Sequence, residues 1–302
     1  LYVKANDGIS LNIYEGETVG LVGESGCGKS TFGRTLLQLY RQTDGKTMYY
    51  GASRDELAPE YIEKTIRHLP HGLHELAALE KKRDEMQKVY DAADEQKRLH
   101  MHNDLTAAKK AANDAYLNIV NVIGGFITAK DLGPVMKIFS ERHDRCCDLH
   151  KAIEKRAPVK LNYDEEAFKL SKLKAGERGY DSRKGKLDKL AEKVAAHDKL
   201  VEAARAEITK VDARIDAMRA KYAADPEFQK HEALLDNGID LARLTYPEAR
   251  TLRCQMQYIF QDPYSSLNPR MTVANIIGEG LLAHKYCKKA NERMHEEILQ
   301  TM

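Results

Sequence analysis

Short runs of apolar residues predict β-strands near both ends of the chain. Residues 9–13 alternate between apolar and polar side chains, which is typical of a strand with one buried face. Residues 18–23 (TVGLVG) and 256–260 (MQYIF) are apolar runs of strand length, and both predict buried strands. Residues 31–40 follow the second of these three strands and have the pattern of a helix. The two ends of the chain therefore indicate an α/β fold.

The middle of the chain has helical periodicity instead. Apolar or small residues recur there at alternating steps of three and four, at Leu187, Leu190, Val194, His197, Val201, Ala204, Ile208, Val211, Ile215, Met218 and Tyr222. This is the heptad pattern of a coiled-coil seam. A weaker version runs through residues 73–112, so we predict an antiparallel hairpin of these two segments. Residues 117–160 are expected to form short helices at its tip, and residues 176–185 a loop into the second arm.

Residues 23–31 read GESGCGKST, a complete phosphate-binding loop of the pattern G-x-x-x-x-G-K-[ST]. The predicted strand before it and the predicted helix after it are the context that this motif requires, and they disfavour a chance glycine-rich turn. Glycines let the backbone curl so that N–H groups point at phosphate oxygens, and the helix dipole adds positive potential. The predicted ATP-binding residues are Gly23, Glu24, Ser25, Gly26, Cys27, Gly28, Lys29, Ser30 and Thr31.

Three side chains of this loop have expected roles. Lys29 should reach the β- and γ-phosphates as a point charge, and we expect it to be catalytic. The Ser30 hydroxyl should ligate Mg²⁺, and Thr31 should add a further contact to phosphate. The expected cofactors are therefore ATP and Mg²⁺.

Two blocks of sequence carry a resemblance to a known family. Residues 15–40 (EGETVGLVGESGCGKSTFGRTLLQLY) and 256–273 (MQYIFQDPYSSLNPRMTV) closely resemble the ATP-binding subunits of oligopeptide and dipeptide ABC importers. The resemblance implies that Gln261 is the Q-loop residue, which contacts Mg²⁺ and the attacking water and reports the nucleotide state to the membrane subunits. It also implies that residues 262–273 face the transmembrane partner. The alternative for Gln261 is an ordinary exposed loop glutamine.

The resemblance is interrupted by 185 residues, 52–236. In the family, a strand like residues 46–50 leads quickly into a segment like residues 237–253. The fold class expected is therefore an incomplete P-loop NTPase core of the ABC type, interrupted by a mainly α-helical insertion that contains the coiled-coil hairpin. We expect three parts: residues 1–51 with the phosphate loop, the insertion at 52–236, and residues 237–302 with the Q-loop and the start of the helical subdomain.

The resemblance implies an ATPase that powers an oligopeptide or dipeptide importer. No LSGGQ-type signature, no apolar strand that ends in Asp-Glu and no switch histidine follows in the sequence. We therefore expect a fragment that binds ATP without competent hydrolysis, since phosphoryl transfer needs all these parts together. One alternative is a non-hydrolysing scaffold that presents a helical interaction arm. Another is a chromosome-maintenance type ATPase, although the coiled coil of those proteins follows the Q-loop.

The expected partners are a second ABC ATPase subunit, identical or different, and transmembrane permease subunits. The insertion has 35 Lys and Arg against 34 Asp and Glu, so no nucleic-acid partner is expected and the partner of the insertion stays unassigned. The chain has five scattered cysteines and no run of eighteen apolar residues. It is therefore expected in the cytoplasm, peripheral to the inner face of the cell membrane through its partner subunits.

A possible metal site lies inside the insertion. His143, Cys146, Cys147 and His150 would share one face of a helix, and thiolates and imidazoles suit zinc. Adjacent cysteines are not the usual C-x-x-C spacing, so core cysteines with solvent-facing histidines are the alternative. The sequence leaves this choice open, together with the transported substrate and the residue that stacks on adenine.

Overall fold

The computed structural model describes residues 5–262, 267–287 and 292–301. Most of the described chain is helical. The helices are α1 (Lys29–Leu36), α2 (Arg54–Leu57), α3 (Glu60–Arg67), α4 (Leu69–Ala92), α5 (Glu95–Ile123), α6 (Gly133–Ser171), α7 (Tyr180–Arg219), α8 (Pro226–Glu232), α9 (Tyr246–Leu252), α11 (Val273–Ala283) and α12 (Glu292–Thr301). Short 3₁₀ helices are η1 (Gly124–Thr128), η2 (Ala220–Tyr222) and η3 (Leu241–Arg243), and the strands are β1 (Met48–Tyr49) and β2 (Ile239–Asp240).

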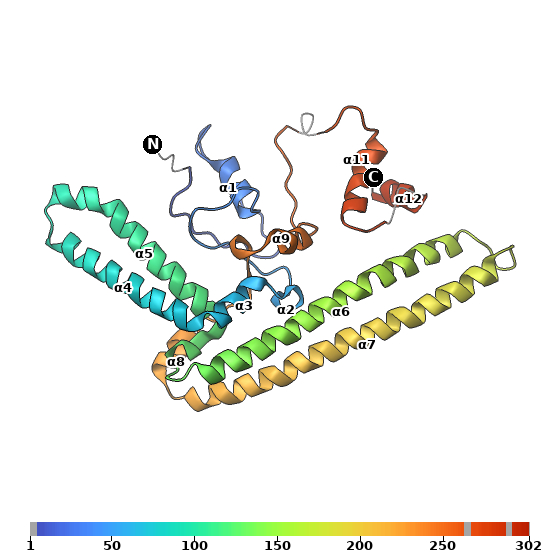
Figure 1. Cartoon of the computed structure of the whole chain (residues 1–302). Helices are drawn as coiled ribbons and strands as arrows, with labels where there is room; N and C mark the ends of the chain where they lie inside the picture. Colours follow the sequence, from blue (N-terminus) through green and yellow to red (C-terminus); the bar gives the residue numbers. More distant parts are fainter. Residues whose placement is uncertain (1–4, 263–266, 288–291, 302) are drawn as a thin grey trace.

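Two helical hairpins diverge from one junction (Figure 1). Helices α4 and α5 form the shorter hairpin, and α6 and α7 form the longer one. The junction consists of α2, α3, η1, α8 and the ends of α5, α6 and α7 next to them. The segments with α1, α9, α11 and α12 lie together on the other side of the junction. None of the helices in the described ranges is long and apolar enough to cross a lipid bilayer.

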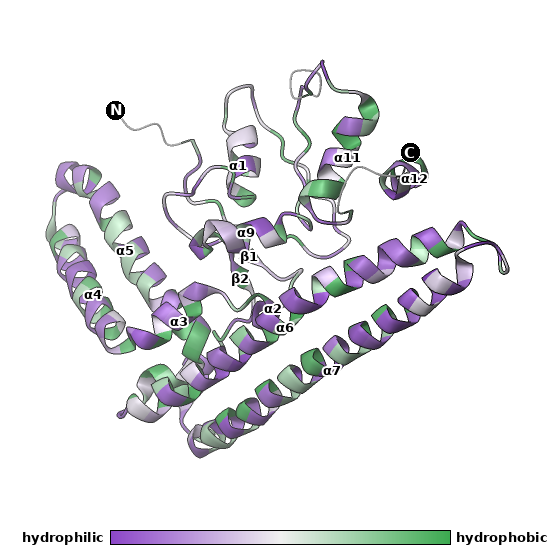
Figure 2. Ribbon diagram, turned by 45° about the vertical axis from the view of Figure 1, so that its right-hand side comes forward, coloured by the Kyte–Doolittle hydropathy of each residue, from purple (hydrophilic) through white to green (hydrophobic). Residues whose placement is uncertain are grey.

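The predicted heptad seam of α7 is the face that packs on α6. Ten of the eleven seam positions lie on α7, and the last, Tyr222, lies in η2. All eleven are buried or half-buried, and most residues between them are exposed. Figure 2 shows the same alternation of hydrophobic and hydrophilic residues along both helices. Ion pairs between the helices run along the hairpin, from Glu141–Arg214 (2.5 Å) near the junction to Glu166–Lys186 (3.0 Å) near the tip. Because opposite charges beside an apolar seam match in only one alignment, they fix the register of the two helices.

The main core lies at the junction. Phe126 is fully buried and packs edge to face against Phe139, Tyr222 and Phe228, with ring centroids 5.2–6.0 Å apart. Such aromatic pairs stabilise a core beyond the area that they bury. These residues come from η1, α6, η2 and α8, so this cluster joins the long hairpin to the short elements of the junction.

The two ends of the helical region, near residues 50 and 238, lie side by side. Strands β1 and β2 pair antiparallel, with Met48 opposite Asp240 and Tyr49 opposite Ile239. The Tyr50 hydroxyl donates to the Asp236 carboxylate at 2.8 Å. Residues 52 and 236 are therefore close in space although 184 positions separate them in the sequence.

The strands predicted at 9–13, 18–23 and 256–260 are not β-strands in the described chain. Val22 and Ile259 are 98% and 91% exposed, so the predicted burial is also wrong here. A strand needs neighbouring backbone for its N–H and C=O groups, and the described residues form one ladder, β1–β2. Apolar periodicity alone cannot supply that partner strand.

The predicted helical hairpin is wrong in its pairing: long antiparallel helices are present, but α7 does not pack on residues 73–112. Residues 73–112 are not one arm, because they contain most of α4 and the first part of α5, and α4 packs on α5. The partner of α7 is α6. Residues 117–160 do not form a tip of short helices, because α6 continues through Pro158 as a single helix of 39 residues. The loop before α7 ends at Gly179, so Tyr180 and the residues that follow it are helical.

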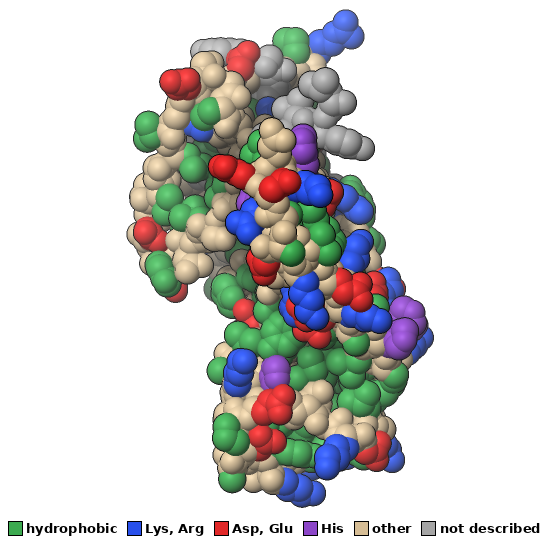
Figure 3. Space-filling view, turned by 90° about the vertical axis from the view of Figure 1, so that its left-hand side faces the viewer, with side chains coloured by type: hydrophobic (Ala, Val, Ile, Leu, Met, Phe, Trp, Pro, Cys, Tyr) green, Lys and Arg blue, Asp and Glu red, His purple; other side chains and the backbone are tan. Residues whose placement is uncertain are grey.

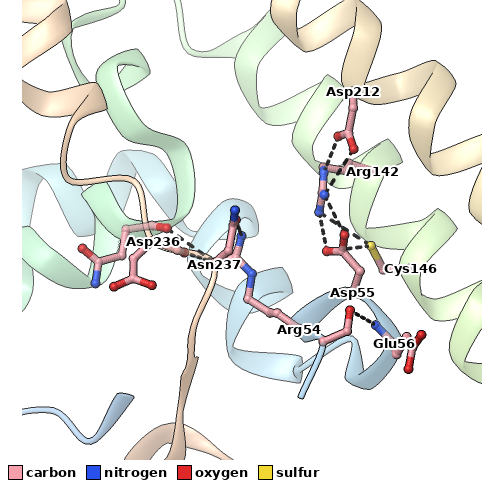
Figure 4. Close-up of polar contacts among 10 residues, drawn as sticks. Arg54, Asp55, Glu56, Arg142, Cys146, Asp212, Asp236 and Asn237 are labelled. Atoms are coloured by element: carbon pink, nitrogen blue, oxygen red, sulfur yellow. Dashed lines mark hydrogen bonds and ion pairs between the residues drawn. The ribbon is translucent and has the colours of Figure 1, made fainter. Parts of the chain in front are cut away.

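An arginine binds three helices together at the junction (Figure 4). The Arg142 guanidinium on α6 donates to both carboxylate oxygens of Asp55 on α2, at 2.8 and 2.9 Å. Its Nε donates to Asp212 on α7 at 2.6 Å. Nearby, the Arg54 guanidinium donates to the backbone carbonyl of Asp236 and to Asn237 Oδ1. These contacts hold α2 against the long hairpin and against the returning chain.

Replacement of Arg142 tests this contact. We expect Arg142→Met to lower the free energy of unfolding by about 2 kcal/mol, because two carboxylates in a half-buried site lose their partner. The matched control is Arg145→Met on the same helix, where the pair with Asp148 is exposed and the expected loss is below about 0.5 kcal/mol. Urea unfolding followed by circular dichroism measures both, and equal losses would contradict the assigned role of Arg142.

The same contact predicts an acid-sensitive fold. Burial disfavours the ionised form of Asp55, but the hydrogen bonds and charge of Arg142 outweigh it and hold the pKa of Asp55 below its ordinary value. Ionised Asp55 therefore stabilises the fold above its unfolded pKa of about 4, and this contribution is lost as the pH falls through the folded pKa. Urea unfolding between about pH 5 and pH 2 should show a smaller loss of stability for Asp55→Asn than for the unchanged chain. Equal pH dependence in the two proteins would show that Asp55 does not contribute.

Candidate nucleotide-binding site

The phosphate-loop sequence forms a turn that leads directly into a helix. Helix α1 begins at Lys29, as the motif predicts, and its N-cap is Gly28. Gly28 has φ +95° and Gly26 has φ +82°, a left-handed backbone that glycine adopts without strain. No side chain caps the helix, so the N–H groups of its first turn point out of the helix without a capping acceptor. This arrangement suits an anion.

Close contacts surround two glycines of the loop, and the contact at Gly28 is with rigid backbone. A Cβ at position 28 would lie 2.4 Å from the carbonyl oxygen of Ala5, and one at position 23 would lie 2.7 Å from the sulfur of Cys27. The backbone around residue 5 therefore passes directly over the start of α1. The sequence pattern gave no signal for this contact, because Ala5 belongs to no motif.

The Lys29 side chain folds back over its own loop. Its Nζ donates to the carbonyl oxygens of Gly23 at 2.7 Å and Glu24 at 2.6 Å, and it lies 3.4 Å from the sulfur of Cys27. An ammonium group has three donors and no acceptor, so it can exchange carbonyl oxygens for phosphate oxygens without losing hydrogen bonds. Lys29 Nζ thus lies within the loop, where it is predicted to bind phosphate.

The other predicted loop residues are open to solvent or on the first turn of α1. Glu24, Ser25, Cys27 and Ser30 are exposed, and Thr31 is half-buried. Cys27 is a free thiol. The Ser30 hydroxyl is therefore accessible to a metal ion that accompanies a bound phosphate.

The segment before Gln261 lies beside α1. A Cβ on Gly33 of α1 would be 3.6 Å from the ring of Tyr258, and the Tyr258 ring contacts Phe260 at 4.9 Å between centroids. Gln261 itself is exposed, and no contact between it and the phosphate loop is found among the described residues. The structure thus brings residues 256–260 next to the helix of the phosphate loop, and the assignment of Gln261 stays a prediction.

These residues fit a nucleotide phosphate with its Mg²⁺. The uncapped start of α1 offers N–H donors, Lys29 offers a positive charge, and Ser30 offers a hydroxyl oxygen of the hard type that Mg²⁺ prefers. At Gly28 the backbone of Ala5 comes so close that a side chain would not fit there.

The candidate zinc residues on α6 are engaged in other contacts. The Cys147 sulfur lies 3.4 Å from His143 Nε2, Cys146 donates to Asp55, and His150 Nδ1 lies 2.8 Å from the carbonyl oxygen of Glu56. Burial raises the pKa of Cys146 to about 12, which disfavours the thiolate that a metal requires. No cluster of three or more metal-binding side chains occurs in the described ranges.

A cavity of about 240 Å³ lies at the junction, apart from the phosphate loop. Its lining includes Arg142, His143, Cys146 and Asp212. These side chains contact one another or the helices around them, so they act in packing within this structure.

Comparisons with known proteins support the interpretation of residues 23–31 as a phosphate-binding loop. Residues 6–121 match the family model described as ABC transporter. This span includes the phosphate loop and continues past residue 51, so it does not test where the predicted insertion begins. No solved structure matches the chain.

The similar curated proteins are ATP-binding proteins of oligopeptide transport. The chain is 49% identical over 65 residues to the oligopeptide transport ATP-binding protein AppF of Bacillus subtilis, which is 22% of this chain and 20% of that protein. It is 61% identical over 49 residues to OppF of Bacillus subtilis, 16% of each chain. For OppF of Escherichia coli the identity is 50% over 58 residues, 19% of this chain and 17% of the relative.

The chain spans about a fifth or less of the length of these relatives. Within that span, the identity is high and the family model and the relatives agree. The resemblance of this chain to the ATP-binding proteins of oligopeptide ABC transporters is therefore confirmed.

Proposed function

We propose that the chain is the ATP-binding part of an ABC ATPase that powers the import of oligopeptides or dipeptides. The observation that carries this proposal is the phosphate loop, which forms its turn, begins α1 at Lys29 and holds the Lys29 ammonium within the loop. The high identity to oligopeptide transport ATP-binding proteins supports the class of substrate.

The loop binds the phosphates of ATP by hydrogen bonds and charge. The N–H groups at the start of α1 donate to phosphate oxygens, and Lys29 exchanges the carbonyl oxygens of Gly23 and Glu24 for the β- and γ-phosphates. The remaining binding residues of the proposal are the loop positions Gly23, Glu24, Ser25, Gly26, Cys27, Gly28, Ser30 and Thr31. Binding is therefore expected to depend strongly on the negative charge of the ligand.

Ser30 and Gln261 are the residues proposed to hold Mg²⁺. Bound Mg²⁺ would neutralise charge on the phosphates and orient them. In this proposal Gln261 also positions the attacking water. The contact of residues 256–260 with α1 supports a place for Gln261 near the loop, since Tyr258 lies against Gly33.

The proposed partners are a second ATPase subunit, identical or different, and transmembrane permease subunits. The chain would act at the cytoplasmic face of the membrane as a peripheral subunit. Tighter binding of ATP to the closed dimer than to the open one would drive the change in the permease.

We further propose that residues 52–236 are an insertion into the ATPase core. The two ends of this segment lie together, since β1 pairs with β2 and Arg54 binds the backbone at Asp236 and Asn237. A segment whose ends meet can be added between two neighbouring residues of a fold at little cost in loop-closure entropy. The helices α2–α8 form most of the junction core, which supports a unit of its own.

Replacement of Lys29 tests the proposed nucleotide site. We expect Lys29→Ala to weaken ATP binding at least about tenfold, because hydrogen bonds to a charged group contribute about 1.5–3 kcal/mol. Calorimetric titration with ATP and Mg²⁺ measures the affinity. The matched control is Lys81→Ala, an exposed lysine of α4, which should leave the affinity unchanged.

Unchanged affinity in Lys29→Ala would overturn the site. If ATP binding were lost and the helical region still bound its partner, the chain would instead be the non-hydrolysing scaffold considered above.

Replacement of Gln261 tests the proposed Q-loop. We expect Gln261→Ala to leave ATP affinity within about twofold, since Lys29 and the loop N–H groups contribute most of the binding. Peptide uptake by cells that carry the whole transporter should fall, because the nucleotide state no longer reaches the permease. The control is Gln255→Ala in the same segment, whose contact is with the Tyr49 hydroxyl. Normal uptake by Gln261→Ala would make Gln261 an ordinary loop residue.

A further inference from the structure

The end of the long hairpin is strongly basic. Residues 169–189, here called the basic tip, comprise the last turn of α6, the connecting loop and the first turns of α7. They contain eight Lys or Arg and three Asp or Glu, a net charge of +5, although the whole chain carries only +2. Positive charge is therefore concentrated at this end of the molecule.

The shorter hairpin provides an internal comparison. Residues 83–103, a segment of the same length around the turn between α4 and α5, contain four Lys or Arg and five Asp or Glu. The side of the molecule turned to the viewer in Figure 3 shows basic and acidic side chains interspersed. A basic end is thus not a general property of helical hairpins in this chain.

The basic tip is an ordered turn. Gly176 and Gly179 have φ +89° and +94°, and Tyr180 N–H donates to the carbonyl of Glu177 at 3.1 Å. Leu173 and Tyr180 are half-buried against the hairpin, so the tip exposes charge more than apolar surface. Because the backbone is already turned, binding does not have to order the loop, and only the exposed side chains lose conformational freedom.

Part of the positive charge is used within the fold. Glu166, which is buried, binds Lys169 at 2.7 Å, Lys186 at 3.0 Å and Arg183 at 3.4 Å. A fourth cation, Lys172, pairs with Glu296. The remaining four are exposed, and the ion pairs among the described residues include none of them; they are Lys174, Arg178, Lys184 and Lys189. These four can contact an external anion.

The position of the basic tip points to the membrane side of the proposed transporter. Lys172, at the start of the loop, forms an ion pair with Glu296 of α12. Helices α11 and α12 lie beside the far half of α6 (Figure 1), and α11 begins at the end of the segment 262–273 that is predicted to face the permease. The basic tip therefore lies next to α12, at the end of the molecule that also holds α11.

We propose that the basic tip docks on the anionic phospholipid headgroups of the membrane that contains the permease; this inference rests on the proposed function. Clusters of four to eight Lys and Arg bind anionic bilayers through charge, and a tip with cations around its end can approach a flat surface end-on. A single-stranded nucleic acid would favour exposed aromatic rings for stacking, and the basic tip has no aromatic residue besides the half-buried Tyr180.

The experiment is cosedimentation of the full chain with phospholipid vesicles. One vesicle preparation is phosphatidylcholine alone, and the other has phosphatidylglycerol as a third of its lipid. The tip variant is Lys174→Glu with Arg178→Glu and Lys184→Glu. The matched control is Lys81→Glu with Lys82→Glu and Lys88→Glu, the same change of charge on exposed positions of α4.

We expect the unchanged chain and the α4 control to bind the anionic vesicles and not the neutral ones. The tip variant should bind the anionic vesicles at least about tenfold more weakly, and high salt should abolish binding of all three. Circular dichroism confirms that the helices of each variant are intact.

Equal binding of the tip variant, or equal binding of the unchanged chain to neutral vesicles, would overturn the proposal. Tip-dependent binding to a single-stranded oligonucleotide, with no binding to vesicles, would overturn it in favour of a nucleic-acid partner. ATP titration of the same variants is a separate measurement. If the unchanged chain did not bind ATP, the proposed function would be refuted. The vesicle experiment would still test whether the basic tip binds anionic lipid.

Discussion

The pairing of β1 with β2 is the constraint on which the arrangement of the helices depends. It fixes residues 48–49 against 239–240, so everything between them must leave and return to one point. Helical hairpins meet this requirement, because each arm that runs outward is followed by one that runs back. The two hairpins and the short helices at their base follow from that closure, and the aromatic cluster around Phe126 fills the space where they meet.

Charge at the junction determines the alignment of these parts. The carboxylates that Arg142 binds belong to Asp55 on α2 and Asp212 on α7, which are 157 positions apart in the sequence. Arg54 extends the same set of contacts to the returning chain at Asn237. A half-buried guanidinium with several acceptors has few alternative geometries, so it favours one packing of the helices over others.

The sequence predicted what depends on local pattern. The structure shows three such local features: the eleven seam positions along α7 and η2, the start of α1 at Lys29, and the tight turns at Gly26 and Gly28. It did not predict that α7 packs on α6, since the burial pattern of α6 is broad and its seam is less regular than that of α7. Pro158 indicated a helix end, but the packing of α6 against α7 outweighs the loss of one hydrogen bond.

The predicted strands are absent from the described chain because a strand depends on hydrogen bonds to backbone elsewhere, which its own sequence does not specify. The contact of Ala5 with the phosphate loop has no sequence signal, since any residue can supply a carbonyl oxygen.

The length of the long hairpin gives it mechanical leverage. At 1.5 Å per residue, the 39 residues of α6 extend about 58 Å from the junction. A tilt of about 5° at the junction therefore moves the far end by about 5 Å, which is one turn of a helix. The Arg142 contacts lie near the junction end of α6. A small change in the angle of α6 there would move the far end of the hairpin most. A hairpin anchored in this way amplifies small rearrangements at its base into displacements on the scale of a side chain at its end.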